Sequence, residues 1–215
     1  MKKGLFITIE GPDGSGKTTI QRDIQEILFQ QGLKFEVTRE PGGIDIAEQI
    51  RRIVLDPKNT EMDARTEALL YAAARRQHLM QKVLPALLEG KNVLCDRFVD
   101  SSLAYQGIGR ELGFEEVLQI NQFAIQDTMP DFTLLLMVEP EVGLERIAQG
   151  RKADEVDRLD SEALAFHQKV YQGYQMVTEK FPERVHVIDA GQDYQTVLAE
   201  AVDAIIHFLQ KRDEE

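Results

Sequence analysis

The segment Gly11-Pro12-Asp13-Gly14-Ser15-Gly16-Lys17-Thr18 decides the fold of this chain, because its spacing, G-x-x-x-x-G-K-T, is that of a phosphate-binding loop. Glycines let the backbone turn tightly, so that successive N–H groups point at one anion. Lys17 adds a cation for the terminal phosphates, and the Thr18 hydroxyl can ligate Mg²⁺. The segment therefore predicts a site for the phosphates of a nucleotide.

The sequence on either side of this loop is the context that such a loop requires. Residues 5–10 form a short apolar run typical of a buried strand. A helix would follow, and its N-terminus carries partial positive charge that favours phosphate. Apolar residues recur on one face of this helix: Ile20, Ile24, Ile27 and Leu28. A glycine-rich turn that matched the spacing by chance would not need both a strand and a helix.

Strand-like and helix-like segments alternate along the rest of the chain. Strands are predicted at residues 5–10, 34–38, 92–96, 132–138 and 185–188. Helices are predicted at 46–54, 62–88 (bent or ended by Pro85), 100–105, 114–125, 140–147, 161–180 and 194–209, with a glycine-bearing loop at 107–113 and a frayed tail at 211–215. Because the strands are apolar throughout, they indicate a parallel sheet covered by helices on both faces. We expect one α/β domain over residues 1–215, with ligands at the carboxyl ends of the strands.

Composition and charge restrict the class of protein. The net charge of −12 argues against nonspecific binding to nucleic acid or to an anionic membrane surface. The chain has no apolar stretch of membrane-spanning length, and its first apolar run is too short for a signal peptide. Its one cysteine, Cys95, lies in an apolar run and fits a reducing compartment. We therefore expect a cytoplasmic protein with small-molecule partners, whose phosphate chemistry depends on a few well-placed cations.

Charged residues stand where several predicted strands end. Glu10 leads into the phosphate loop, Thr38-Arg39-Glu40-Pro41-Gly42-Gly43 ends the second strand, and Asp96-Arg97-Phe98 ends the third. A carboxylate in the position of Asp96 is the usual Mg²⁺ ligand in chains with such a loop, either directly or through water. Asp96 could instead cap the following helix. The Glu40–Pro41 bond could be cis, and the sequence leaves its isomer open.

Further cations indicate a second phosphate site. Arg97 offers a planar fork for phosphate, although an ion pair with Asp96 or Glu40 would give it a purely structural role. An acid-rich segment carries more cations: Arg146, Arg151, Lys152 and Arg158. A loop that closes over transferring phosphoryl groups needs movable cations, so we predict a mobile lid at about residues 147–160, with a solvated charged loop as the alternative. Together these features favour phosphoryl transfer from ATP to a second phosphorylated molecule.

The order of five motifs resembles that of bacterial thymidylate kinases from about Leu5 to the last helix. The motifs are the phosphate loop with Thr19, the run from Thr38 to Gly43, Arg75-Arg76-Gln77-His78, the run from Asp96 to Gly107, and Asp157-Arg158-Leu159-Asp160. The resemblance implies a P-loop NTPase-type parallel five-stranded sheet flanked by helices, with a mobile lid. It also implies transfer of the γ-phosphoryl group of ATP to thymidine monophosphate (dTMP), with Mg²⁺, giving dTDP and ADP, by a homodimer.

The resemblance implies a role for each matching residue. Residues 11–18 would hold the ATP phosphates, with Thr18 and Asp96 at the metal. Asp13 would reach the 3′-hydroxyl and phosphate region of dTMP, and Arg97 would hold the dTMP phosphate and bridge toward the donor. The catalytic residues implied are Lys17, Arg97, Asp13 and the lid residue Arg151. The residues implied to bind dTMP are Arg39, Arg51, Tyr71, Arg75, Ser102, Tyr105 and Gln106.

Two residues depart from the pattern of this family. Phe98 replaces the commoner Tyr, and Tyr71 replaces the usual Phe that stacks on thymine. Gly14 follows the loop acid, as in the subgroup that keeps its catalytic arginine in the lid. Taken alone, Tyr71 on a long helix would be a core residue, and Arg75 with Arg76 a solvated face. A crowded 2′ position, with Tyr105 as the candidate residue, would favour deoxyribose.

Other functions are compatible with parts of the pattern. A kinase of the same fold could act on another monophosphate or on a deoxynucleoside. A nucleotide switch would act by binding partners, but the Asn-Lys-x-Asp guanine signature is absent from the sequence. A third alternative is a structural α/β protein whose phosphate loop no longer functions. In that protein, replacing Lys17 by alanine would change nothing in catalysis. Apolar faces in residues 62–88 could form the interface of a dimer.

Overall fold

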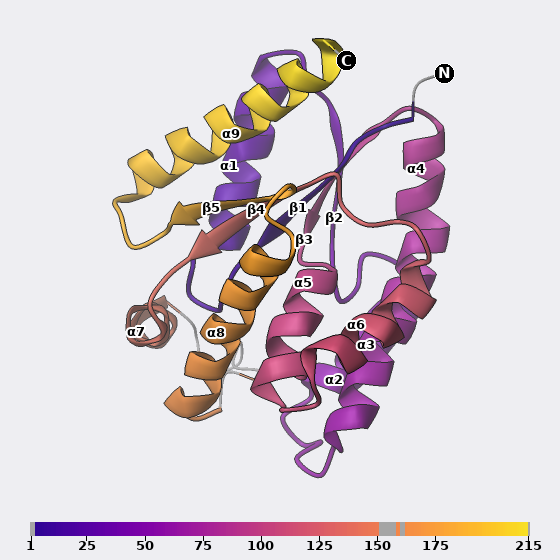
Figure 1. The fold of residues 1–215 in the computed structure, drawn as a ribbon, viewed down its shortest axis with the longest axis vertical. Coiled ribbons are helices and arrows are strands. Elements are labelled where there is room, and N and C mark those ends of the chain that lie inside the picture. Colours follow the sequence, from indigo (N-terminus) through magenta and orange to yellow (C-terminus); the bar gives the residue numbers. More distant parts are fainter. Residues whose placement is uncertain (1–2, 151–157, 160–161, 215) are drawn as a thin grey trace.

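The computed structural model describes residues 3–150, 158–159 and 162–214, which contain a five-stranded sheet in the order β2-β3-β1-β4-β5. Every pairing of neighbouring strands is parallel, so the predicted fold class is confirmed. Strand β1, which carries the phosphate loop at its end, lies at the centre (Figure 1). The strands are β1 Phe6–Glu10, β2 Phe35–Arg39, β3 Asn92–Asp96, β4 Phe132–Met137 and β5 Val185–Asp189.

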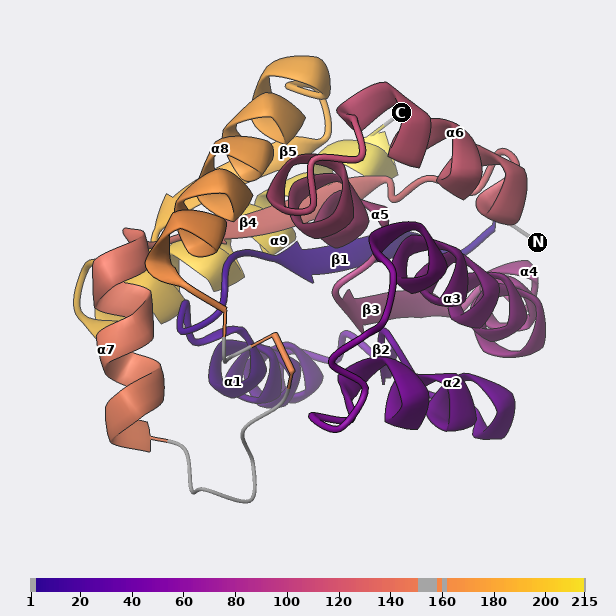
Figure 2. The same cartoon turned by 90° about the horizontal axis from the view of Figure 1, so that it is seen from below.

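Helices connect the strands and cover both faces of the sheet. Figure 2 shows α1 on one side of β1 and α5 with α8 on the other. The described helices are α1 Lys17–Gln30, α2 Asp45–Leu55, α3 Ala64–His78, η1 Leu79–Val83, α4 Leu84–Leu88, α5 Val99–Ser102, η2 Leu103–Gly109, α6 Phe114–Ile125, α7 Pro140–Gly150, α8 Leu164–Lys180 and α9 Tyr194–Glu214. None of the helices in these described ranges is long and apolar enough to cross a membrane.

Two apolar layers pack against the two faces of the sheet. Ile7 and Ile9 of β1 belong to the layer formed with α1 and α9. Phe6 belongs to the opposite layer, where it meets Phe98 edge-on and where α3, α6 and α8 contribute. Because side chains alternate along a strand, Glu10 faces the same side as Phe6. The last residue of β1 is therefore a buried carboxylate, directly before the phosphate loop begins.

The predicted loop at Gly107 and Gly109 is wrong, because both glycines lie inside the π-helix η2. Because they have no side chain, these glycines let neighbouring helices pack closely against η2, and they form no turn. A Cβ on Gly109 would lie 2.8 Å from a ring carbon of Phe166 in α8. On the other side of the contact, a Cβ on Gly173 would lie 2.6 Å from the Cα of Ala104. Backbone therefore meets backbone where η2 crosses α8, and the local sequence alone cannot show such a contact.

Other element boundaries differ less from the sequence prediction. Pro85 stands in the first turn of α4, directly after η1 ends at Val83, where the continuous helix changes from π- to α-helical. The predicted helix at 161–180 is described from Leu164. The prediction of a frayed tail from Lys211 is wrong, since α9 continues to Glu214. The Glu40–Pro41 peptide bond is cis.

Candidate active site

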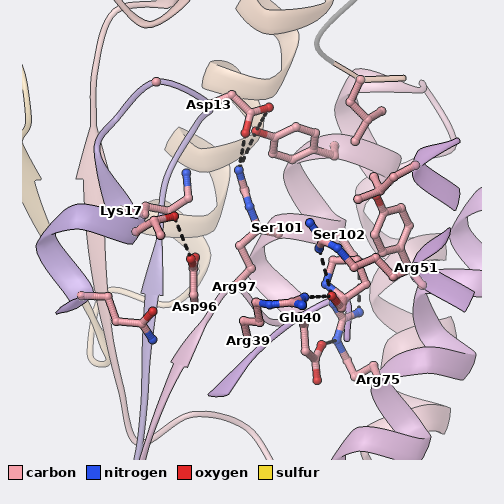
Figure 3. Close-up of a pocket in the computed structure, with 18 of the residues that line it drawn as sticks. Asp13, Lys17, Arg39, Glu40, Arg51, Arg75, Asp96, Arg97, Ser101 and Ser102 are labelled. Atoms are coloured by element: carbon pink, nitrogen blue, oxygen red, sulfur yellow. Dashed lines mark hydrogen bonds and ion pairs between the residues drawn. The ribbon is translucent and has the colours of Figure 1, made fainter. Parts of the chain in front are cut away.

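A cavity of about 460 Å³ opens at the carboxyl edge of the sheet and collects most of the predicted site residues (Figure 3). The strand register explains this, because Asp96 pairs with Ile9 on one side and with Arg39 on the other. The loops after β1, β2 and β3 therefore begin at the same edge. The predicted residues that line the cavity are Asp13, Gly14, Gly16, Lys17, Thr18, Arg39, Arg51, Tyr71, Arg75, Asp96, Arg97, Ser102, Tyr105 and Gln106.

Three predicted residues within the described ranges are not part of this lining. Gly11, Pro12 and Ser15 belong to the phosphate loop but do not line this cavity. Arg151 and most of the predicted lid lie outside the described residues, while residues 147–150 belong to α7. The prediction for Arg151 therefore stays a prediction.

The phosphate loop owes its shape to its glycines. Gly14 and Gly16 have φ angles of 76° and 85°, in the left-handed region that glycine adopts most easily. Gly14 also has no room for a side chain, because a Cβ would lie 2.1 Å from the carbonyl oxygen of Gly143 in α7. Gly16 caps the N-terminus of α1, so the positive end of that helix faces the loop. The loop thus forms an anion-binding cradle in front of a helix N-terminus.

Lys17 folds back over the loop that precedes it. Its Nζ donates to the carbonyl oxygen of Pro12 at 2.8 Å, and its side chain is buried. Burial and the neighbouring charge of Arg97 lower the pKa of Lys17 to about 8, although Asp13 and Asp96 act in the opposite direction. A bound phosphate would add negative charge beside the ammonium and favour its charged form.

Thr18 and Asp96 bring two oxygen ligands together beside the loop. The Thr18 hydroxyl lies 3.4 Å from Oδ2 of Asp96, and Oδ1 of Asp96 is buried with no hydrogen-bond partner among the residues that the structure describes. The carboxylate that accepts from a backbone N–H in the first turn of α5 is that of Glu10, which lies 3.3 Å from the Ser101 nitrogen, so Asp96 does not serve as the cap of this helix. Such hard oxygen donors fit Mg²⁺. Within the described ranges no group of three or more His, Cys, Asp or Glu side chains could hold a metal, so phosphate and water oxygens would complete the shell.

Arg97 reaches from the end of β3 to the phosphate loop. Its φ of 67° lies in the left-handed region, which costs a non-glycine residue about 1 kcal/mol. One guanidinium nitrogen donates to Oδ1 of Asp13 at 2.5 Å, and the other donates to the Gly11 carbonyl oxygen at 3.1 Å. The Tyr105 hydroxyl donates to Oδ2 of Asp13 at 2.8 Å. Arg97 therefore pairs with Asp13, and neither Asp96 nor Glu40 is its ion-pair partner.

A buried cluster beneath Arg97 was only partly evident from the sequence. Burial and the nearby charge of Asp100 raise the pKa of Glu10 to about 7. Glu10 accepts hydrogen bonds from the backbone N–H of Phe98 and from the Ser101 hydroxyl, both at 2.6 Å. The hydroxyl of Tyr174 in α8 also lies 3.2 Å from Glu10. The sequence did not predict Tyr174 as a site residue, because only the packing of α8 on η2 brings its hydroxyl next to Glu10.

A second group of cations stands at the end of β2 and on α2. One guanidinium nitrogen each from Arg39 and Arg51 donates to the carbonyl oxygen of Pro41, at 2.9 and 3.0 Å. Arg39 also pairs with Glu48 at 2.8 Å. In Figure 3, Arg97 lies between this pair and Lys17. Cations therefore face the cavity from two sides, with Arg97 between them.

The far end of the cavity is lined from α3 and η2. Tyr71 is almost fully buried there, and Arg75 is 2% exposed, so the alternative of a solvated face is wrong for Arg75. Arg75 donates to Glu40, to the Ser102 hydroxyl, to Asn121 and to the carbonyl oxygen of Phe98. These four bonds leave one of its five N–H groups without a partner in the described part of the chain. Arg75 can therefore give a ligand at most one hydrogen bond without rearrangement.

A second cavity, of about 520 Å³, lies on the other side of the phosphate loop. It shares Gly14 and Gly16 with the first cavity and adds residues from α7 and from the start of α9. Arg146 borders it and donates to the carbonyl oxygen of Ala190 at 2.9 Å. Gln192 and Tyr194 also line it. These two residues lie outside every motif in the sequence, and only the fold brings them to this cavity.

Comparisons with known proteins agree with this arrangement. The family model described as Thymidylate kinase matches residues 9–201. A thymidylate kinase of Bacillus velezensis is 61% identical over 208 residues, which are 97% of this chain and 98% of the relative. One of Halalkalibacterium halodurans is 59% identical over 95% of this chain and 97% of the relative. The crystal structure of thymidylate kinase from Ehrlichia chaffeensis superposes with a TM-score of 0.75 at 31% identity, covering 94% of this chain and 99% of that chain.

Proposed function

This chain belongs to the thymidylate kinase family, and from that premise we propose how its residues divide the transfer of a phosphoryl group between donor and acceptor. It phosphorylates dTMP to dTDP with ATP as the co-substrate. The assignment of residues rests on one cavity, whose lining extends from the phosphate loop to Tyr71 and Gln106. One domain would then hold both substrates, with the loop between them.

On the donor side, residues 11–18 hold the ATP phosphates. The second cavity beside Gln192 and Tyr194 takes the adenosine part of ATP, an assignment supported by the loop glycines that the two cavities share. Lys17 neutralises the terminal phosphates, because its ammonium is already buried over the loop. Arg151 supplies a further cation from the lid.

On the acceptor side, Arg39 and Arg51 hold the dTMP phosphate and Arg97 spans the gap to the donor. The proposal is supported by the two guanidinium groups that converge on Pro41 and by the ion pair of Arg97 with Asp13. Asp13 fixes Arg97 and faces the 3′-hydroxyl of dTMP. The acceptor phosphate oxygen is already anionic at neutral pH, so the transfer needs positioning and neutralised charge more than a strong base.

The thymine base would occupy the far end of the cavity. Tyr71 gives it a flat face to stack on. Gln106, Ser102 and the remaining N–H of Arg75 face its edge. Tyr105, held by Asp13, stands near the sugar and restricts the 2′ position. These roles are supported by the shared lining of the cavity from α3 and η2.

A panel of acceptors tests the function directly. Purified protein with ATP should release ADP rapidly with dTMP and slowly with AMP, CMP or thymidine, measured in a coupled ADP assay. Gln106→Ala should lower kcat/KM for dTMP by about 100-fold, because the polar edge of the bound base would lose its hydrogen-bond partner. The KM for ATP should not change, because Gln106 lies at the other end of the cavity. A faster rate with another monophosphate would overturn the acceptor assignment. Turnover of ATP that ignores every acceptor would indicate a nucleotide switch.

Mg²⁺ would be held by Thr18 and Asp96 together with phosphate oxygens. When bound, the ion neutralises charge that develops on the phosphates. Asp96→Asn removes a charged ligand, so the Mg²⁺ concentration for half-maximal activity should rise about tenfold. The measurement is a Mg²⁺ titration at saturating ATP and dTMP. An unchanged midpoint would show that Asp96 does not serve the metal, directly or through water.

We also propose that the chain forms a homodimer through α3 and α6 and acts in the cytoplasm. Leu69, Ala73 and Met80 are exposed at helical spacing along one face of α3 and η1. Arg76 lies on the same face and donates to the carbonyl oxygen of Ala124 in α6, beside Phe123, which is 90% exposed. An apolar strip across two packed helices is typical of an interface. The buried free thiol of Cys95 fits a reducing cytoplasm.

Phe123→Asp should convert the dimer into a monomer, because a charge at the centre of an apolar interface has no partner. Light scattering coupled to size exclusion would give half the mass of the unmodified protein. Phe29→Asp is the matched control, since Phe29 is also an exposed phenylalanine but lies on α1, away from this strip. A monomer mass for the unmodified protein at working concentration would overturn the proposal.

A further inference from the structure

Glu67 is a fully buried carboxylate directly behind the cavity, and no motif in the sequence singles it out. It lies in the first turn of α3. Its Oε1 accepts a hydrogen bond from the side-chain nitrogen Nε2 of Gln106 at 2.8 Å. Gln106 lines the cavity, whereas Glu67 does not. Glu67 is thus in position to act on a ligand only through Gln106.

Two arginines hold the Glu67 carboxylate in place. The Nε of Arg110 lies 3.2 Å from Oε2, and a guanidinium nitrogen of Arg158 donates to the same oxygen. Arg158 is itself fixed, because its Nε donates to the carbonyl oxygen of Val54 at 3.0 Å. Arg110 is paired on its other side with Glu162 at 2.6 Å. The carboxylate therefore has little freedom to turn away from Gln106.

This contact determines which way the amide of Gln106 points. An ionised carboxylate can only accept hydrogen bonds, so the NH₂ group of Gln106 must face Glu67. One N–H is used there, and the Oε1 oxygen and the second N–H remain for a ligand. No described residue donates to that Oε1. The amide therefore presents an acceptor and a donor, side by side and in a fixed order.

We propose that Glu67 is a positioning residue that makes this site specific for the thymine edge over the cytosine edge. The inference rests on the proposed placement of the dTMP base beside Gln106. Thymine offers an N3–H donor next to a carbonyl acceptor, which matches the fixed amide. Cytosine offers the reverse, an N3 acceptor next to an amino donor, and would match only if the amide turned over. Glu67 prevents that turn, because a reversed amide would place its oxygen against the carboxylate.

Glu67→Gln tests this step with little change of shape. The new amide can donate as well as accept, so the Gln106 amide becomes free to turn over. The ratio of kcat/KM for dTMP to kcat/KM for dCMP should fall at least about tenfold, mainly through a higher KM for dTMP. The KM for ATP should not change. The ratio for dTMP to dUMP should also stay constant, because uracil presents the same edge as thymine.

Glu162→Gln is the matched control, because it neutralises a carboxylate of the same cluster that does not touch Gln106. It should keep the dTMP to dCMP ratio of the unmodified protein. If Glu67→Gln does not fold, Glu67→Asp keeps the charge for both arginines but withdraws the carboxylate from Gln106, and the ratio should again fall. A folded Glu67 variant with an unchanged ratio would overturn the proposal. If Gln106→Ala has no effect on dTMP, the placement of the base is wrong instead, and the proposal falls with it.

Discussion

Replacing Arg97 by alanine is expected to lower kcat/KM for dTMP by about 1,000-fold, because we propose that Arg97 is the cation between the donor and acceptor phosphates. Its guanidinium spans from the Gly11 carbonyl oxygen in the loop to the Asp13 carboxylate. In the variant, the charge on the transferring group would lose its bridging cation. Asp13 would also lose the positive charge of Arg97 beside the phosphates, where its negative charge repels them. The measurement is steady-state kinetics at saturating ATP, with thermal unfolding to check the fold.

Two further variants separate these causes. Arg97→Lys keeps one charge but loses the fork that reaches Asp13 and the loop together, so it should recover only part of the activity. Arg97→Ala combined with Asp13→Asn removes the carboxylate charge that Arg97 no longer balances, and should be more active than Arg97→Ala alone if repulsion contributes. A folded Arg97→Ala with more than a tenth of the normal kcat/KM would show that the ion pair with Asp13 is only structural.

Local sequence was sufficient wherever one short segment fixes both the backbone and the chemistry. The loop at residues 11–18 combines glycines at positive φ angles with the lysine and threonine of the phosphate-loop spacing. Asp96 and Arg97 follow a strand, and a parallel sheet brings all strand ends to one edge. Their meeting in one cavity was therefore predictable before any contact was known.

The parts that the sequence could not show depend on contacts between distant elements. Gly107 and Gly109 were expected in a loop, but both are helical, and α8 packs against Gly109 while the start of α6 packs against Gly107. Tyr174 reaches Glu10 across 164 positions of sequence. Glu67 lies in the first turn of α3, where an acid favours the helix dipole, and no sequence motif singled it out. Only the fold turns its carboxylate toward Gln106.

The cations themselves were predictable, whereas their partners were not. Arg97 was expected to pair with Asp96 or Glu40 if it were structural, and it pairs with Asp13 instead. Arg97 has a left-handed backbone, and its side chain reaches the phosphate loop at the Gly11 carbonyl oxygen. The Glu40 carboxylate instead contacts the side chains of Arg75 and His78. Such choices depend on backbone angles and burial, which a spacing pattern does not contain.

Lys17→Met is expected to lower kcat by about 1,000-fold and to change the pH dependence of ATP use. The active form of Lys17 is the charged ammonium, and its pKa of about 8 in the free protein means that this form is lost as the pH rises through 8. Since kcat/KM reports ionisations of the free enzyme, kcat/KM for ATP should fall above about pH 8.

The profile of kcat should not show that fall, and this difference identifies the group. Bound phosphates favour the ammonium, so the pKa of Lys17 rises in the complex with ATP. Lys17→Met should abolish the alkaline limb of kcat/KM for ATP along with most of the activity. Lys180→Met, which removes an exposed lysine on α8 that pairs with Glu115 on the surface, should leave both profiles unchanged. If the alkaline limb persists in a folded Lys17→Met, another group produces it, and the charge of Lys17 is not what limits capture of ATP.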